Sequence, residues 1–286
     1  MAMAAETTMD TRPVDAATAA AIEAAEARTW ADLYAAAPPR WAQEVDRGSV
    51  EIGGARVLHW AAAGRRYFTR AIGLGVTEPA TDAAIAAILA FWTGRGIDTF
   101  LLQSLPHCLP DNFDERLRAH GLRPFDAHDR IVRGAEPAVA LPADDGRPMA
   151  VERVTRETAG EWSEFLQRVY RLDTGPSLPL LIDRPGWHQY VAREGGQIVA
   201  ARGMHIGPDG IAWLGMDGPV PGLMTDDHAP DAAICAAIVA DGLAHGARMF
   251  IADIEAPSER MDTPAYASFA RLGFRRPYVR THWTRP

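Results

Sequence analysis

Apolar and polar positions alternate along the chain with periods that predict one order of helices and strands, and this order occurs twice. Apolar residues that recur with a period of two predict a strand, and those that recur with a period of about 3.6 predict a helix. In the second half they predict a strand at 149–154, a helix at 158–172, three strands within 188–216, a long helix after 229, a strand at 248–254, a short helix that ends at Gly273 and a last strand at 278–283. In the first half, they predict a helix at 14–37, three strands within 49–76, a long helix after 80, a strand at 99–103, a short helix that ends at Gly121 and a last strand at 131–133. The first half thus follows the same order without an opening strand.

The long helix of each half carries the clearest match between the two series. The stretch 80–88 resembles the stretch 229–237, and a glycine follows each helix. In the second copy, Pro230 suits a first helical position and Asp231 the first turn, and apolar residues recur at the i, i+3, i+4 spacing of an amphipathic helix: Ile234, Ala237 and Ile238. Alanine-rich helices match by chance, so the ordered series carries more weight than this helix in predicting a repeat.

The composition between the two series predicts where the domains meet. Residues 134–147 are rich in alanine, proline, aspartate and glycine, which is typical of a linker. We therefore predict a disordered N-terminus at 1–13, a first domain at 14–133, the linker at 134–147 and a second domain at 148–286.

Composition narrows the class of protein. With 286 residues, of which 48% are hydrophobic, the chain can bury a large core. It contains no apolar run of about 18 residues and no signal-peptide pattern at its N-terminus, so we expect a cytoplasmic protein without a membrane partner. The net charge of −8 argues against a nucleic-acid partner and favours a cationic or amine-bearing ligand. Only Cys108 and Cys235 could form a disulfide, and a buried, inert thiol is expected for Cys235.

The order of elements resembles that of the GNAT superfamily of N-acyltransferases. The resemblance covers most of residues 14–285, and its firmest point is Arg271-Leu272-Gly273-Phe274, which follows the last helix of the second half. It implies an α/β (α+β) fold of two tandem GNAT-like domains, each with a mixed, mostly antiparallel twisted sheet flanked by helices. It also implies an enzyme that moves an acetyl or other acyl group from acyl-CoA to a small-molecule amine.

The same resemblance implies a binding site for acetyl-CoA before the long helix. In the family, a glycine-rich signature there, Arg/Gln-x-x-Gly-x-Gly/Ala, binds the pyrophosphate through backbone N–H groups. The residues implied in the second half are Met216, Asp217, Gly218, His228, Ala229 and Ala232. Both copies depart from the signature, as Asp227–Ala232 and Glu78–Ala83. Proline removes an N–H donor in each, and carboxylates near a helix start oppose an anion that the helix alone would favour by roughly 0.3–2 kcal/mol.

Two groups of residues are candidates for catalysis. Asp253 and Glu255 lie two apart in a predicted strand, so both side chains face one side, where a buried carboxylate could act as a base for an amine. The alternative is a pair of strand-end charges that face solvent or pair with an arginine. The family places an acidic tyrosine where this chain has Phe269, and Tyr266 lies one turn earlier. The alternative is that Tyr266 is a packing residue.

The nine histidines do not indicate a metal site, because none has the HxH or HxxxH spacing of metal ligands. Two functions remain open. The first is acyl transfer from acetyl-CoA to a small amine. The second is a GNAT-fold protein that has lost normal CoA binding and serves as a ligand-binding or interaction module, or as a CoA-independent enzyme. Neither the oligomeric state nor the active half follows from the sequence.

Overall fold

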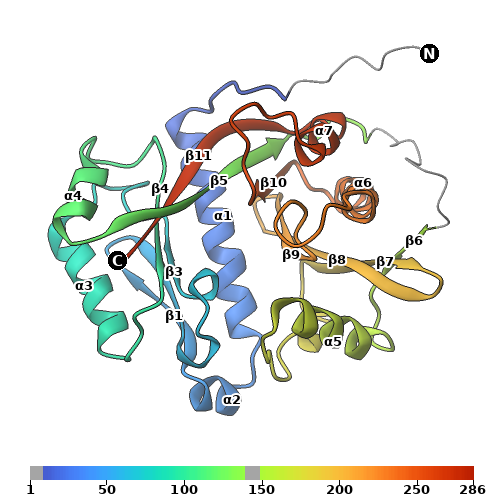
Figure 1. Cartoon of the computed structure of the whole chain (residues 1–286), viewed down its shortest axis with the longest axis horizontal. Coiled ribbons are helices and arrows are strands. Elements are labelled where there is room, and N and C mark those ends of the chain that lie inside the picture. The colour runs from blue at the N-terminus through green and yellow to red at the C-terminus, as the bar shows by residue number, and fades with distance from the viewer. Residues whose placement is uncertain (1–8, 139–148) are drawn as a thin grey trace. The chain divides into compact units, whose positions relative to one another are not determined.

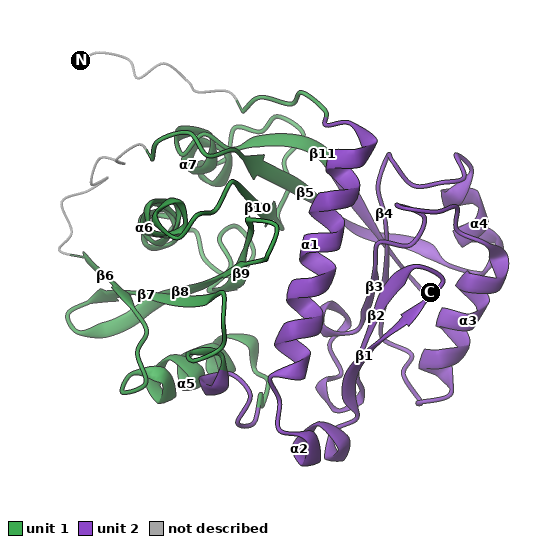
Figure 2. Ribbon diagram, turned by 180° about the vertical axis from the view of Figure 1, so that it is seen from behind, with its two compact units in different colours: residues 1–13, 129–174, 181–278 green, residues 14–128, 175–180, 279–286 purple. Residues whose placement is uncertain are grey.

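The computed structural model describes residues 9–138 and 149–286, and the chain forms two compact units (Figure 2). Unit 1 comprises residues 1–13, 129–174 and 181–278, and unit 2 comprises 14–128, 175–180 and 279–286. Part of the predicted linker and the start of the predicted disordered N-terminus lie outside the described residues. Within the described ranges, no helix has both the length and the apolar character needed to cross a lipid bilayer.

Unit 1 contains a mixed sheet with helices on both faces (Figure 1). Its strands lie in the order β5-β10-β9-β8-β7-β6, and their bounds are β5 (Arg123–Arg133), β6 (Met149–Arg153), β7 (Trp187–Glu194), β8 (Gln197–Ile206), β9 (Ile211–Gly218) and β10 (Met249–Ile254). The pairing of β9 with β10 is parallel, and the other pairings are antiparallel. The helices are α5 (Ala159–Tyr170), α6 (Ala229–Ala244) and α7 (Pro264–Arg271).

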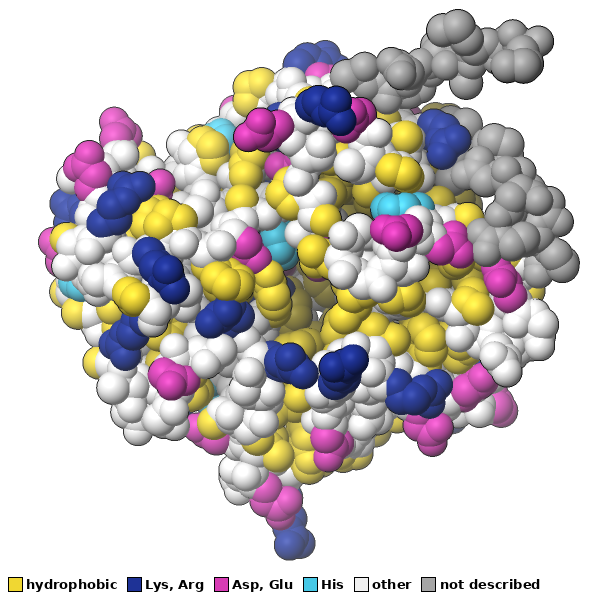
Figure 3. Space-filling model, viewed as in Figure 1, with side chains coloured by type: hydrophobic (Ala, Val, Ile, Leu, Met, Phe, Trp, Pro, Cys, Tyr) yellow, Lys and Arg dark blue, Asp and Glu magenta, His cyan; other side chains and the backbone are white. Residues whose placement is uncertain are grey.

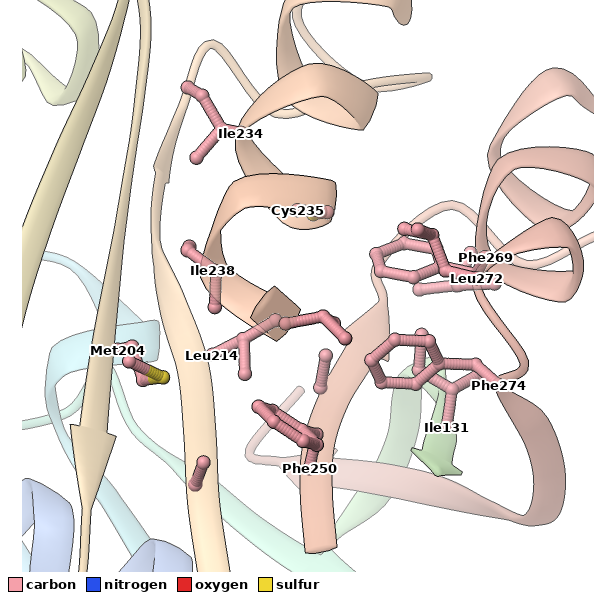
Figure 4. Close-up of a cluster of buried hydrophobic side chains, with 14 of the residues drawn as sticks. Ile131, Met204, Leu214, Ile234, Cys235, Ile238, Phe250, Phe269, Leu272 and Phe274 are labelled. Carbon is pink, nitrogen blue, oxygen red and sulfur yellow. The ribbon is translucent and has the colours of Figure 1, made fainter. Parts of the chain in front are cut away.

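The core of unit 1 lies between its sheet and the helices α6 and α7, as Figure 4 shows. Met204 of β8, Leu214 of β9 and Phe250 of β10 face Ile238 of α6, and all four side chains are at most 2% exposed. Burial of such a side chain contributes roughly 1.5–3 kcal/mol. The predicted apolar side of α6 is therefore confirmed at Ile238.

Unit 2 contains the remaining strands together with residues 123–128 of β5. Its strands lie in the order β1-β2-β3-β4-β11, and their bounds are β1 (Arg47–Ile52), β2 (Ala55–Trp60), β3 (Arg70–Ile72), β4 (Leu101–Ser104) and β11 (Arg275–Thr284). The helices are α1 (Ala16–Ala35), α2 (Pro39–Glu44), α3 (Asp82–Thr93) and α4 (Phe113–Ala119). Short 3₁₀ helices occupy Ala61–Ala63, Arg66–Phe68 and Pro179–Leu181.

The two series of elements are confirmed. The order long helix, strand, short helix, strand occurs as α3-β4-α4-β5 and again as α6-β10-α7-β11. In both, the strand before the long helix pairs in parallel with the strand after it, as β3 with β4 and as β9 with β10. The described residues ahead of α1 contain no strand, as the pattern of the first half predicted.

The last strand of each series pairs within the unit formed mainly by the other series. At the end of β5, Arg133 lies opposite Phe250 and Asp129 opposite Ile254 of β10. Near the end of β11, Thr281 lies opposite Ser104 of β4. The domain bounds 14–133 and 148–286 describe the two repeats, and as boundaries of independent folding they stay a prediction.

A buried ion cluster holds the end of β11 within unit 2. Arg280 is fully buried, and its Nη1 atom donates to the carboxylates of Glu23, at 3.4 Å, and of Glu26, both on α1. The Nη2 atom of Arg70 lies 3.7 Å from the second oxygen of Glu26. Buried charges of this kind persist only when they are paired.

We expect the substitution Arg280→Ala to lower the free energy of unfolding by about 3–5 kcal/mol, because it leaves two buried carboxylates without their main partner. Urea denaturation followed by circular dichroism measures this change. Arg65→Ala is the control, because Arg65 is exposed in the same unit and its substitution should leave the midpoint unchanged. Equal midpoints for the two variants would contradict the role given to Arg280.

Candidate functional site

Strands β9 and β10 separate partway along their length. Their parallel pairing runs from Met249 opposite Ile211 to Ile251 opposite Trp213 and ends there. Beyond this point β9 contains a bulge on its β8 side, where Met216 has a positive φ of 55°. A bulge increases local twist and redirects side chains. The strand ends thereby diverge and leave space between them.

A pocket of about 410 Å³, with open solvent at its mouth included, lies at this divergence within unit 1. Its polar lining comes from the middle of β8, from the ends of β9 and β10 with the residue after β10, and from the start of α6. These residues are Arg202, Asp217, His228, Asp231, Asp253 and Glu255, together with Ser268 of α7. The pocket therefore presents four carboxylates and one guanidinium group.

Arg202 is the central charge of the pocket. Its Nε atom donates to Asp231 Oδ1 at 2.8 Å, and its Nη2 atom donates to Asp231 Oδ2 at 3.1 Å and to Asp217 Oδ2 at 3.0 Å. The side chain is 3% exposed. Burial alone would lower the pKa of Arg202, but the two carboxylates outweigh it and raise this pKa well above its usual value. Arg202 is therefore a permanent cation.

The two carboxylates that Arg202 binds differ in position. Asp231 lies in the first turn of α6, where a negative charge is favourable. Asp217 follows the bulge of β9, and burial raises its pKa above the ordinary value in spite of the nearby guanidinium. The hydroxyl of Tyr170 donates to the backbone carbonyl of Asp217 and fixes the strand at this residue.

The start of α6 is capped by the chain itself. The N–H of Ala229 donates to Asp227 Oδ1 at 3.2 Å, and Pro230 at the next position has no N–H. Asp231 then holds the guanidinium of Arg202. Two carboxylates and a proline thus occupy the helix end at which an anion would otherwise bind.

Asp253 and Glu255 of the β10 segment line the same pocket, as their spacing predicted. The side chain of Asp253 is 13% exposed, and its Oδ1 atom lies 3.2 Å from Nη1 of the fully buried Arg130. Arg130 belongs to β5, so the arginine partner of Asp253 comes from the first series. Asp253 is therefore paired with an arginine, as its alternative predicted, and its role as a base stays a prediction.

Tyr266 does not line the pocket. Its hydroxyl donates to the carboxylate of Asp129 and accepts the N–H of Ser258 at 3.0 Å, and the residue is 1% exposed. Burial and the bond to Asp129 raise the pKa of Tyr266 to about 12. This geometry matches the packing alternative, and a catalytic role for Tyr266 stays a prediction.

The structure brings together five of the nine predicted site residues. These five line the pocket: Asp217, His228, Ala232, Asp253 and Glu255. Met216, Gly218 and Ala229 adjoin lining residues in the chain without lining the pocket themselves. The roles of all nine in binding or catalysis stay predictions.

Sequence reasoning missed Arg202 and the apolar side of the pocket. Arg202 interrupts an otherwise apolar strand, and a charged residue at such a position is rarely buried unless it is paired. That rule could have singled it out. Phe269 occupies the position of the family's tyrosine and Leu272 belongs to the Arg271–Phe274 stretch, but their apolar spacing is that of any core-facing helix and does not indicate a pocket lining.

The structure also gathers histidines that are far apart in the sequence. In unit 2, His282 Nδ1 lies 2.6 Å from Asp126 Oδ1, and His128 lies in the same group. In unit 1, His188 and His245 both contact the carboxylate of Asp241. In each group one histidine is at hydrogen-bond distance from the carboxylate, and the expected absence of a metal site stays a prediction.

Comparisons with solved structures find proteins of similar fold, whereas comparisons by sequence find none. By sequence, the chain matches no protein family model and no curated protein. By structure, it is similar to a GCN5-related N-acetyltransferase from Kribbella flavida, with a TM-score of 0.58 and 17% identity over 84% of this chain and 90% of that chain. It is also similar to a GCN5-related N-acetyltransferase from Sphaerobacter thermophilus, with a TM-score of 0.55 and 15% identity over 81% of each chain.

The chain has the GNAT fold. The alignments extend over most of the chain, which agrees with the two series of elements and confirms the predicted fold class. Sequence identities this low establish the fold alone and leave the reaction open.

The GNAT fold implies acyl-CoA, and the residues at the start of α6 do not fit its pyrophosphate. Asp227 already accepts the N–H of Ala229, and Pro230 offers no donor. The carboxylate of Asp231 lies in the first turn. A pyrophosphate at this helix end would meet like charges where the GNAT signature supplies backbone donors.

We expect Arg202→Ala to lower the free energy of unfolding at pH 7 by about 3–5 kcal/mol, because Asp217 and Asp231 become buried charges without their partner. Burial raises the pKa of Asp217 and Arg202 opposes this, so without Arg202 this carboxyl holds a proton at a higher pH in the folded chain than in the unfolded chain. The folded state takes up this proton as the pH falls, so the destabilisation should be smaller at pH 5 than at pH 7.

Urea midpoints of the Arg202→Ala and unaltered chains at the two pH values measure this difference. Arg156→Ala, which removes an exposed pair with Asp183, is the control and should change neither midpoint. A loss of stability that is independent of pH would show that the carboxylates are not the cause.

Proposed function

We propose that this GNAT-fold protein binds a small primary amine, as its ammonium ion, in the pocket of unit 1. The observation that carries the proposal is the charge of the pocket lining, which contains Asp217, Asp231, Asp253 and Glu255 against Arg202. Ligand pockets owe their selectivity to a few convergent polar groups within a mostly apolar lining. Here those groups select for positive charge.

The carboxylates outnumber the guanidinium groups that the printed contacts place in or beside the lining. Asp217, Asp231, Asp253 and Glu255 line the pocket together with Arg202. Arg130 contacts Asp253 from outside the lining and adds a second positive charge. An ammonium ion is attracted by this excess of carboxylates, and a further anion would add repulsion at low dielectric.

Asp253 and Glu255 are the groups proposed to hold the ammonium ion. Asp231 and Asp217 are engaged with Arg202, whereas Asp253 and Glu255 reach the pocket from the separated end of β10. A carboxylate at hydrogen-bond distance from an ammonium group can also accept its proton and leave the free amine. The same pair therefore accounts for binding and for activation of an amine.

Acyl transfer to that amine is the second candidate function. The separation of β9 and β10 favours it, because the space lies beside the group that would hold the amine. Acetyl-CoA as the donor is a prediction from the resemblance, and the start of α6 argues against the usual position of its pyrophosphate.

Isothermal titration with butylamine in phosphate buffer, which contains no competing amine, tests the binding proposal. We expect saturable binding, and we expect Glu255→Gln or Asp253→Asn to weaken it about 10- to 100-fold, because a hydrogen bond to a charged group contributes about 1.5–3 kcal/mol. Glu259→Gln is the matched control, since Glu259 is exposed and outside the lining. Equal affinities in all variants, or equal binding of butyrate, would contradict the proposal.

Acetyl-CoA tests the second candidate separately. We expect no saturable heat with the unaltered chain, and we expect the double substitution Asp227→Arg and Pro230→Gly to create or strengthen binding, because it removes a carboxylate and restores an N–H donor. Mass spectrometry of butylamine incubated with acetyl-CoA and the unaltered chain would reveal an acetylated product. Such a product would establish acyl transfer and show that the donor binds in another way.

A further inference from the structure

The pocket of unit 1 has two chemically different sides. Its charged groups come from the strand ends and from the first turn of α6. Its apolar groups come mainly from the facing helices, as Ala232 and Cys235 of α6 and as Ala265, Phe269 and Leu272 of α7. Figure 4 shows Phe269 and Leu272 pointing from α7 toward Cys235 of α6.

The apolar side consists of well-packed core residues. Cys235 and Leu272 are 1% exposed, and Phe269 is 5% exposed. Burial raises the pKa of the Cys235 thiol well above its usual value, so this thiol adds no charge to the helical side. Ser268 contributes a neutral hydroxyl to the helical side. In the lining, the ionised groups thus belong to the strand ends and the start of α6.

We propose that the ligand is a primary amine with one ammonium group and an apolar alkyl or aryl body, which lies along α7. This inference rests on the proposed function and names the class of amine. The ammonium group lies at Asp253 and Glu255, and the body contacts Ala265, Phe269 and Leu272. A second ammonium group on the same ligand would lie against these apolar side chains and lose its hydration without a partner.

Calorimetry with ethylamine, butylamine and 1,4-diaminobutane tests the proposed class of amine ligand. Each methylene group buried against α7 should lower the Kd about fourfold, which corresponds to about 0.8 kcal/mol per methylene. Butylamine should therefore bind about 16-fold more tightly than ethylamine. It should also bind more tightly than 1,4-diaminobutane, although the diamine has the higher charge.

Ala265→Leu supplies the site-specific variant, because Ala265 is half-buried on the apolar side and a larger residue there shortens the space for the body. It should reduce the difference in affinity between butylamine and ethylamine. Ala267→Leu is the matched control, since Ala267 is half-buried on the same helix and does not line the pocket.

The outcomes separate this inference from the proposed function. A graded gain with chain length that Ala265→Leu removes and Ala267→Leu retains would support an apolar amine. Tighter binding of 1,4-diaminobutane, or equal binding of ethylamine and butylamine, would overturn the apolar class and leave amine binding in place. Absence of binding by all three amines would overturn both.

Discussion

The exchange of terminal strands between the two series is the constraint on which the rest of the structure depends. β10 of the second series completes its pairing with the end of β5 from the first series. β4 of the first series pairs with the end of β11 from the second. An unpaired strand edge leaves backbone donors and acceptors unsatisfied. Each series therefore supplies a strand that pairs with a strand of the other series.

Residues of the candidate site also contact side chains from the other series. Arg130, which contacts Asp253, and Asp129, which accepts the hydroxyl of Tyr266, both belong to β5. Arg276 of β11 also contacts Asp129 at 3.2 Å. The position of Asp253 in the second series therefore depends on Arg130 of the first, so the first series contributes to the site as well as to the core.

Two buried arginines each pair with two carboxylates, but they have different roles in the structure. Arg280 pairs with Glu23 and Glu26 and ties β11 to α1 within unit 2. Arg202 pairs with Asp217 and Asp231 beside the pocket of unit 1. Each guanidinium group is costly to bury and is held by two carboxylates. Because the second cluster borders a pocket, it also contributes to the charge that a ligand meets there. Its Asp231 lies in the first turn of α6, the helix end that a GNAT fold normally offers to an anion.

The sequence alone determined the order of elements, because apolar spacing reflects which side of each helix or strand is buried, and this is a local property. It singled out Asp253 and Glu255, which both line the pocket, although β10 ends at Ile254 and Ile254 lines the pocket as well, so strand alternation alone does not place them there. It also determined that the start of α6 is poor in anion donors, since Pro230 lacks an N–H in any fold. Only the tertiary structure decided that the last strands are exchanged, that Arg202 reaches Asp217 and Asp231, and that Tyr266 bonds with Asp129. These contacts join residues that are distant in sequence, and long-range pairing depends on how whole elements pack, which no local pattern specifies.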